Sequence, residues 1–413
     1  MRTVLHQPSL TLLLSLLVFL APDVKAQEIW PDGSPMEDWF SGERANVQMP
    51  SSRFLITDYG AVADSTCLQT EAIQKTIDAA SASGGGTVVV PRGTFLVSSL
   101  FFKQGTALYL EEGSCLKGSD DISDYPVAEV HIEGVLQPYI AAIVNAYDLN
   151  GFVIAGKGTI NGNGLRYWRD FWKRREVNPA CTNLEALRPR MIYISKCHDV
   201  TISGVTLKDS GFWTLHLYKS DRIRLLNLDI TAPVEPVKAP SSDGVDLDGC
   251  KDVHIKDCRI SVNDDIIALK GGKGPWADLD PDNGMNERVL LEDCFFGHGP
   301  GVLTFGSECL GAKNIILRNA QVHGADRLVW FKMRPDTPQE YTDILVEKVS
   351  GEVGSALYVH PWTQFFDLKD RKDIPMSYGR NLIIRDCDLE VGQMTDIIQK
   401  DDQYRLENIR LVF

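Results

Sequence analysis

From residue 197 onward, apolar residues recur at offsets 0, 2, 5 and 7 of a repeated segment, with mostly polar or turn residues between them. Steps of two are typical of a β-strand, and the step of three indicates a turn of the chain. A seventh, imperfect segment has Gly351 in its last position. Complete segments begin at Val200, Ile223, Val253, Val289, Ile315 and Leu382.

The residue at offset 4 is of the same kind in nearly every segment. It is Gly, Asn or Asp, which adopt a left-handed backbone at least cost, in six segments, and Lys348 in the imperfect one. Each coil is therefore predicted to be a strand, a sharp corner, a strand and a further strand. The strands of a β-sandwich would not repeat the same kind of turn residue at the same offset in segment after segment. The pattern predicts an all-β fold, a right-handed single-stranded parallel β-helix with internal ladders of side chains.

Three regions are expected along the chain. Residues 1–26 have a positive start at Arg2, an apolar run and a Val-Lys-Ala ending, as in a signal peptide. Residues 27–50 lack periodicity and are expected to form an extended arm, and 51–413 the parallel β-helix catalytic domain as one elongated domain. Within it, residues 71–82 are predicted to be a helix that covers the open N-terminal end, with Thr70 as its N-cap.

The composition excludes several classes of protein and of binding partner. The 413 residues, 44% of them hydrophobic, can bury a large core, which excludes a disordered chain and a small disulfide-stapled scaffold. A net charge of −14 argues against nucleic acid or an anionic membrane surface as a general partner. Among the nine cysteines, Cys258, Cys294 and Cys387 share offset 5 and are predicted to be small core residues, so no disulfide framework is expected.

The third strand of each coil follows the offset-7 residue. Alternation places one set of side chains inward: Val245, Leu247, Ile267, Leu269, Leu303, Phe305, Val329, Phe331, Leu357 and Val359. The other set is predicted to stack on one outer face: Asp246, Ala268, Lys270, Thr304, Trp330, Lys332, Tyr358 and His360.

Candidate chemistry gathers at the start of these strands. Asp243, Asp264 and Asp265 open two adjacent strands, and His298 lies in the turn of the next. Glycoside hydrolysis needs one carboxylic acid to protonate the leaving oxygen and an ionised one to activate water or attack carbon. Crowding of carboxylates raises one pKa and so supplies the acid, and Trp330 and Tyr358 could stack on a sugar ring. Each residue taken alone has an ordinary explanation, which for the aspartates is a solvated turn or a calcium site. The prediction therefore depends on all of these residues lying on one outer face.

The motifs occur in a known order. They are Ser241-Ser242-Asp243-Gly244, Asn263-Asp264-Asp265, Gly297-His298-Gly299 and a strand ending in Lys332. This order resembles the polygalacturonase family of glycoside hydrolases, family 28, over about residues 54–400. Further matching stretches are 56–62, 158–164, Arg188-Pro189 and 212–216.

The resemblance implies a pectin-lyase-like solenoid that cleaves pectic polysaccharide or oligosaccharide with inversion and needs no metal or cofactor. It implies that Asp264 is the general acid, that Asp243 and Asp265 activate water, and that His298 supports protonation of the acid. Lys332 would bind a uronate carboxylate. Further candidates for substrate binding are Lys270, Trp330, Tyr358, His360 and Arg334.

Two positions depart from the family pattern. Ser241-Ser242 stands where Asn-Thr is usual, which should leave Asp243 functional. Trp330 stands where the last motif usually has an arginine, and a tryptophan cannot replace a bidentate carboxylate ligand. Arg334 is a hypothetical substitute. A rhamnogalacturonan backbone, a xylose-decorated pectin or exo action all remain open, and residues 273–286, with Trp276, would favour exo action if they close the groove.

Two rival functions are a pectate-type lyase, in which the three aspartates would hold calcium, and a non-catalytic carbohydrate-binding β-helix. The motif order favours the hydrolase. The protein is expected to be exported to the periplasm or secreted, to be a monomer with no membrane insertion after signal cleavage, and to bind no nucleic acid.

Overall fold

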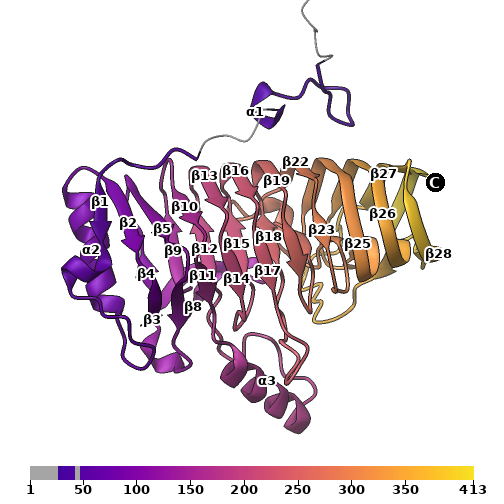
Figure 1. Cartoon of the computed structure of the whole chain (residues 1–413). Coiled ribbons are helices and arrows are strands. Elements are labelled where there is room, and N and C mark those ends of the chain that lie inside the picture. The colour runs from indigo at the N-terminus through magenta and orange to yellow at the C-terminus, as the bar shows by residue number, and fades with distance from the viewer. Residues whose placement is uncertain (1–26, 42–46) are drawn as a thin grey trace, which may run out of the picture.

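The computed structural model describes residues 27–41 and 47–413. The predicted signal peptide, residues 1–26, lies outside the described residues. A 27-stranded sheet system contains all strands except β7 and β8, and its strands pair in parallel between successive coils. Figure 1 shows the coils stacked side by side along one axis, from β1 near one end to β28 at the other. The predicted right-handed single-stranded parallel β-helix is confirmed.

Three parallel sheets run the length of the stack. The first contains β1 (Arg53–Leu55), β2 (Gly86–Val90), β5 (Thr106–Leu110), β10 (Val153–Gly156), β13 (His198–Ser203), β16 (Asp221–Leu226), β19 (Lys251–Lys256), β22 (Asn286–Glu292), β27 (Ser377–Arg385) and β29 (Tyr404–Val412). The second contains β3 (Gly93–Val97), β6 (Ser114–Gly118), β11 (Thr159–Asn161), β14 (Thr206–Lys208), β17 (Asp229–Thr231), β20 (Arg259–Ser261) and β23 (Phe295–Phe296). The third contains β4 (Leu100–Phe101), β9 (Val144–Tyr147), β12 (Ile192–Ser195), β15 (Leu215–Tyr218), β18 (Val245–Asp248), β21 (Ile267–Lys270) and β24 (Leu303–Phe305). Three long strands continue through more than one sheet: β25 (Gly311–Met333), β26 (Glu340–Pro361) and β28 (Asp388–Ile397).

The corners of the coils have the predicted backbone. All seven offset-4 residues have positive φ angles, between 51° and 77°: Gly204, Asn227, Asp257, Asp293, Asn319, Lys348 and Asp386. Lys348 adopts φ 54° although lysine has no special preference for it, because its coil must turn in register with its neighbours. Gly351, the exception at offset 7, has a packing cause: a Cβ there would lie 2.1 Å from the carbonyl oxygen of Val322.

The predicted inward ladder of the third strands is confirmed. Val245 pairs with Ile267, Ile267 with Leu303, Leu303 with Val329 and Val329 with Leu357, and all five side chains are fully buried. Of the three offset-5 cysteines, Cys258 and Cys294 are buried and Cys387 is half-buried, and all nine cysteines are free.

Helix α2 (Thr70–Ala82) covers the N-terminal end of the stack (Figure 1), as predicted. Ile73, Ile77 and Ala80 enter the main core. Thr70 is wrong as the N-cap, because Gln69 holds that position and Thr70 Oγ1 instead accepts a hydrogen bond from the Ser98 amide, at 2.8 Å.

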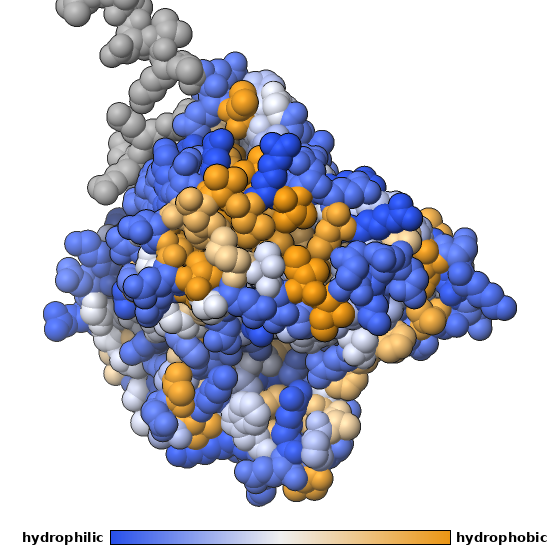
Figure 2. All heavy atoms as spheres, turned by 90° about the vertical axis from the view of Figure 1, so that its right-hand side faces the viewer, coloured by the Kyte–Doolittle hydropathy of each residue, from blue (hydrophilic) through white to orange (hydrophobic). Residues whose placement is uncertain are grey.

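The opposite end of the stack is apolar. Figure 2 looks onto this end and shows a broad hydrophobic area. Large apolar side chains are exposed on the last coils: Met394, Ile397, Ile398, Val412 and Phe413. Among the described residues, no helix is long and apolar enough to cross a membrane.

Insertions between the strands create the surroundings of the site. Helix α3 (Leu165–Val177) projects from the stack (Figure 1), and β7 (Val127–Ile132) forms an antiparallel hairpin with β8 (Val135–Ile140). Short 3-10 helices are η1 (Ile56–Tyr59), η2 (Ile122–Asp124) and η3 (Ala277–Leu279).

The N-terminal arm contains the single turn α1 (Asp38–Ser41) and packs on the outside of the first sheet. Its side chains Trp30, Met36 and Phe40 are buried against Leu290 of β22 and Ile316 of β25. Ion pairs add to this contact, since Arg318 donates to Glu28 at 2.7 Å and Lys313 Nζ lies 3.0 Å from Asp32.

Candidate active site

The outer face of the third sheet has the predicted register. Asp246, Ala268, Thr304, Trp330 and Tyr358 are successive partners from β18 to β26. Lys270 follows in register with Asp248, and Lys332 with His360. Inserted segments cover this face, so Asp246 and Thr304 are fully buried although they point away from the core of the coil.

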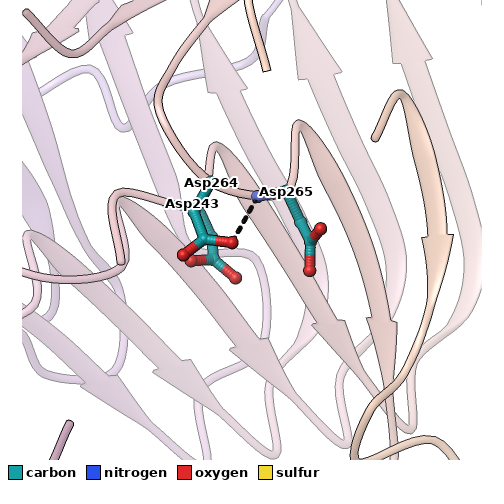
Figure 3. Close-up of side chains that lie close together, drawn as sticks. All are labelled: Asp243, Asp264 and Asp265. Carbon is teal, nitrogen blue, oxygen red and sulfur yellow. Dashed lines mark hydrogen bonds between the residues drawn. The ribbon is translucent and has the colours of Figure 1, made fainter. Parts of the chain in front are cut away.

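Three aspartates meet at the start of the strands. Asp243 precedes β18, and Asp264 and Asp265 precede β21 in the next coil (Figure 3). One carboxylate oxygen of each lies within 4.8 Å of the others. The Asp265 amide donates to Asp264 Oδ1 at 3.0 Å, the bond drawn in Figure 3. The predicted clustering of the three carboxylates is therefore present.

Asp265 accepts hydrogen bonds from two donors. Lys332 Nζ lies 2.6 Å from Oδ2, and the Thr304 hydroxyl donates to Oδ1 at 3.0 Å. All three side chains are buried, and charge-assisted hydrogen bonds of this length are the stronger kind. The side chain of Asp265 is thus fixed in position by the next two coils of the stack.

Neighbouring carboxyls are pushed toward their neutral forms. Burial, and then the charge of Asp265, raise the pKa of Asp264 above its ordinary value, against the opposing effect of Lys332 and Lys270. Burial and the adjacent Asp246 and Asp264 raise the pKa of Asp243 well above the ordinary range. Burial raises the pKa of Asp246 to about 7. Carboxyls with raised pKa values therefore lie beside Asp265, which is paired with Lys332, an arrangement suited to acid/base catalysis.

Lys270 joins several of these acids. Its Nζ lies 3.3 Å from Asp246, 3.5 Å from Asp243 and 3.6 Å from Glu308, and 4.1 Å from the centre of the Trp213 ring. The side chain is almost fully buried, and burial lowers its pKa less than these carboxylates raise it. Lys270 therefore remains a cation and neutralises charge beneath the site.

A pocket of about 270 Å³ opens over the aspartates. This volume is close to the lower limit of about 300 Å³ for ligand sites. Its floor comes from the third sheet and its walls from inserted segments. The lining includes Glu133, Phe171, Trp172, Arg175, Asn183, Trp213, Lys238, Asp243, Asp264, Asp265, Lys270, Lys273, Glu308, Lys332, Arg334, Trp362 and Phe365.

The walls are connected to one another. Gly134, at the tip of the β7–β8 hairpin, packs so closely that an added Cβ would lie 2.9 Å from Lys273 and 3.0 Å from Glu308. Arg371 donates to the carbonyl of Pro275 and to Asp278, joining residues 362–376 to residues 271–285. Lys273 of the predicted closing loop lines the pocket, whereas Trp276 lies against Arg371, 4.9 Å from its guanidinium carbon.

Several lining residues were not singled out by the sequence as site residues. Glu133 and Gly134 form a two-residue link between two apolar runs, which is a hairpin signal. Helix α3 carries Tyr167, Trp168, Phe171 and Trp172 at helical spacing, a signal of an amphipathic helix. Glu308 follows β24 by three residues and has no distinguishing pattern. Spatial proximity of these segments to the aspartates could not be read from either pattern.

Four predicted site residues lie outside the pocket lining. The His298 side chain is exposed, and among the described residues its imidazole makes no hydrogen bond. Trp330 is buried beside Lys332, its ring centre 4.2 Å from Nζ. Tyr358 packs edge-on against Trp330 at 5.7 Å and donates a hydrogen bond to His360 at 2.7 Å. Trp362, whose ring centre lies 5.9 Å from that of Trp330, is among the aromatic residues that line the pocket in their place.

Arg334 lines the pocket but its donors are occupied. Nε and Nη2 form a bidentate pair with Asp336, each at 2.8 Å, and the remaining contacts are to the carbonyls of Gln364 and Phe365. Arg334 thus holds residues 364–365 in place. Its two parallel N–H donors are used by Asp336 and cannot also bind a substrate carboxylate in a bidentate way.

The aspartate cluster has the ligand type and spacing of a divalent-cation site. Two ammonium groups already supply the positive charge, since Lys332 contacts Asp265 and Lys270 lies beside Asp243. These cations favour a site that works without a metal ion.

Three parallel sheets with a pocket of carboxylates and lysines define the class: a parallel β-helix protein with an acid/base site. The profile described as Glycosyl hydrolases family 28 matches residues 90–356, well over half of the chain, and the chain belongs to this family. A second profile, described as Rhamnogalacturonase A/epimerase, pectate lyase-like, matches residues 54–111.

Curated relatives show moderate identity. The chain is 28% identical over 283 residues to a probable polygalacturonase from Vitis vinifera, covering 64% of this chain and 55% of that protein. It is 25% identical over 337 residues to an exo-poly-alpha-D-galacturonosidase from Dickeya chrysanthemi, covering 70% and 54% respectively. The chain thus spans about half the length of the curated relatives it matches.

Solved structures share the fold. An exopolygalacturonase from Thermotoga maritima has a TM-score of 0.68 at 20% identity, covering 88% of this chain and 92% of that chain. A polygalacturonase from Erwinia carotovora has a TM-score of 0.66 at 19% identity, covering 90% and 96%. At these identities the likeness shows the right-handed β-helix and no more.

Proposed function

We propose that this protein hydrolyses α-glycosidic bonds of a pectic polysaccharide or oligosaccharide by an inverting acid/base mechanism. The observation that carries the proposal is the contrast between Asp265, which accepts hydrogen bonds from Lys332 and Thr304, and Asp264, whose pKa is raised. Asp264 would protonate the leaving glycosidic oxygen. Asp265 would take a proton from the attacking water, and Asp243, in its neutral form, would hold that water in position.

The spacing of the carboxylates suits a shared water. A water molecule bonded to two oxygens at about 2.8 Å spans roughly 4.6 Å between them, and the three carboxylates lie within 4.8 Å of one another. Attack by that water on the anomeric carbon, opposite the departing oxygen, inverts the configuration. Asp264 loses its proton to the leaving group in the same step, and the water supplies the new hydroxyl.

The charge of the pocket supports an acidic substrate. Six cations and five acids line it, namely Arg175, Lys238, Lys270, Lys273, Lys332 and Arg334 against Glu133, Asp243, Asp264, Asp265 and Glu308. Burial and the neighbouring Glu308 raise the pKa of Glu133, as burial does for Asp243 and Asp264, so neutral forms of these acids leave the pocket more positive. A locally basic site of this kind attracts a uronate although the whole chain is acidic.

The walls favour exo action as the mode of cleavage. The β7–β8 hairpin meets residues 273 and 308, and residues 362–376 are tied to residues 271–285, so the site is a pocket with connected walls. A pocket of about 270 Å³ holds the end of a sugar chain more readily than its middle. The exo-acting relative from Dickeya chrysanthemi supports the same mode.

One experiment tests the proposal. Wild type and Asp264→Asn are incubated with homogalacturonan and rhamnogalacturonan, and the products are followed by NMR for anomeric configuration. We expect inverted monosaccharide or disaccharide products from wild type, and binding without turnover from Asp264→Asn. A UV-absorbing unsaturated product, or loss of activity in EDTA, would indicate a lyase. Unchanged function in Asp264→Asn would indicate a binding protein, and retained configuration would contradict inversion.

His298 has a proposed supporting role for the acid, which requires its exposed side chain to approach Asp264 when substrate binds. A His298→Gln variant should then lower kcat and shift the pH profile. An unchanged profile would remove His298 from the mechanism.

Export is proposed from the first 26 residues, with a periplasmic or extracellular location and a monomeric mature chain that does not insert in the membrane. Mass spectrometry of the native protein should find Gln27 at its N-terminus. An unprocessed chain retained in the cytoplasm would contradict this.

A further inference from the structure

The position of the usual carboxylate-binding arginine is occupied by a residue that cannot bind an anion. Trp330 lies in register between Thr304 and Tyr358 and packs under Arg327, whose guanidinium carbon is 4.2 Å from its ring centre. Arg327 itself donates to the carbonyl of Pro300 at 3.0 Å and does not line the pocket. A uronate must therefore be held by a different cation.

The cations on the sheet side of the pocket are already neutralised. Lys332 is paired with Asp265, Lys270 lies among three carboxylates, and Arg334 is paired with Asp336. Lys273 faces Glu133 at 3.8 Å. Binding a substrate carboxylate at any of these four would require an existing ion pair to break or share its charge.

Two lining cations on the opposite wall have no such partner. Within residues 27–41 and 47–413, the guanidinium of Arg175 and the ammonium of Lys238 make no ion pair and no hydrogen bond, and Arg175 Nε is buried without a partner. Arg175 is in the last turn of α3, and Lys238 is in the segment between β17 and β18. The Trp172 indole donates to the Lys238 carbonyl at 2.7 Å, which fixes the two segments together.

The surroundings of Arg175 are strongly positive. Its guanidinium carbon lies 4.8 Å from the centre of the Phe171 ring, and that of Arg188 lies 4.4 Å from the same ring. Arg188 is fully buried and donates to the carbonyls of Ala186 and Pro240, and no carboxylate of the described residues forms an ion pair with it. Of these two guanidiniums on one aromatic ring, Arg175 lines the pocket, and an anion bound there would stabilise the pair.

We propose that Arg175, with Lys238 beside it, binds the uronate carboxylate of the substrate and replaces the arginine that the last motif lacks. This assignment rests on the proposed function. It places substrate recognition on α3, an inserted helix, and leaves the chemistry on the third sheet. Specificity for a uronate then depends on the pocket wall that carries Arg175 and Lys238, opposite Lys270 and Lys332.

Paired substrates and paired variants test this assignment. Arg175→Gln, Arg175→Lys and Lys238→Gln are assayed on oligogalacturonate and on its carboxyl-methylated form. Arg174→Gln is the matched control, because Arg174 is in the same helical turn, exposed, and outside this pocket. We expect Arg175→Gln to lower kcat/KM on the free acid by about 10- to 100-fold, as loss of charge-assisted hydrogen bonds implies. On the methyl ester, the same variant should keep nearly the kcat/KM of wild type.

Retention of charge gives a second readout. Arg175→Lys should recover part of the activity, because lysine keeps the charge without the bidentate fork. The Tm of Arg175→Gln should not fall, since the change relieves repulsion with Arg188. Oligogalacturonate binding measured by calorimetry in an Asp264→Asn background should weaken on adding Arg175→Gln.

The outcomes separate the two proposals. If wild type cleaves oligogalacturonate and both Arg175→Gln and Lys238→Gln match Arg174→Gln, the inference is wrong and the hydrolase remains. Equal loss on the acid and its ester would also overturn the inference, because a carboxylate ligand must discriminate between them. If wild type cleaves no pectic substrate, the proposed function and this inference both fail.

Discussion

Asp264 and Asp265 are sequence neighbours in different electrostatic environments. Asp265 accepts hydrogen bonds from Lys332 and Thr304 of later coils. Asp264 is half-buried at the pocket, and within the described part of the chain the Asp265 amide is its only hydrogen-bond donor. Their alternate directions at the start of a strand produce this difference. Two identical side chains can therefore have opposite roles without any separation in sequence.

The raised pKa of Asp264 gives a pH prediction. A general acid acts only when protonated, so kcat/KM should fall as pH rises through the Asp264 pKa, above the usual value of 3.8. A pH–rate profile measures this alkaline limb. The residual rate of Asp264→Asn, lower by about 10²- to 10⁴-fold, should lack the limb. An alkaline limb that persists in Asp264→Asn would assign the acid to another group.

Thr304 is a positioning residue for Asp265. We expect Thr304→Val, which keeps the shape and removes the donor, to lower kcat by about 10-fold with KM little changed. Thr206→Val, on β14 of the second sheet, is the matched control. A change in KM alone would show that Thr304 contributes only to binding, and no change in kcat would contradict the role.

At the scale of elements, the pocket belongs to insertions and the chemistry to strands. The strands deliver the carboxylates through a register that repeats from coil to coil. The hairpin, α3 and the segments near residues 273 and 362 form the walls. Changes in these two groups of elements should therefore have separable effects.

The hairpin tip provides a test of this separation. Gly134→Ala should displace the tip from Lys273 and Glu308, raise KM and allow longer products, because the wall opens. Gly151→Ala is its control: φ is 81° against 78° for Gly134, and nothing lies within 4 Å of its added Cβ. Both should lose about 1 kcal/mol of stability from backbone strain. Only Gly134→Ala should change the length of the products, as measured by chromatography. The same product lengths from both variants would show that the hairpin does not determine exo action.

The elements also show what the sequence could predict. Offsets within the coils are local and repeated, so the β-helix, its corners and the outer face of the third strands followed from the pattern. The pairing of Lys332 with Asp265 did not, because the pattern places both residues near one face without fixing their contact. Helix α3 and the hairpin have recognisable patterns of their own, but their folding back over the aspartates depends on contacts such as Trp172 with Lys238 and Gly134 with Lys273. Those contacts join residues 66 and 139 positions apart, beyond any periodic signal.

At the scale of the whole molecule, the arm and the stack are joined through a buried acid. Glu292, at the end of β22, accepts from His254 at 3.0 Å, Lys256 at 2.7 Å and Arg318 at 2.7 Å, and Arg318 also reaches Glu28 of the arm. Burial alone would raise the pKa of Glu292, but these donors lower it below its ordinary value overall.

This linkage predicts a pH-dependent stability. A lowered folded-state pKa gives stability that is present above the unfolded pKa, near 4.5, and is lost as pH falls toward the folded value. Glu292→Gln should therefore cost about 2 kcal/mol at pH 7 and much less near pH 3, in denaturant titrations. Glu390→Gln, on the exposed side of β28, is a control that should cost little at either pH. A cost of Glu292→Gln that does not shrink with acidity would show that packing, not charge, is responsible.

The left-handed corners have a consequence for how such a protein can diversify. Because each of the seven coils turns through one residue with positive φ, which is Asn, Asp or Gly in all but the Lys348 coil, the segment between two coils can lengthen or shorten without moving the next strand. The stacked coils can thus stay unchanged while the segments inserted between them vary. Transplanting α3 with its Arg175 into another β-helix of this kind is a design route to new substrate preference that leaves the reacting carboxylates in place.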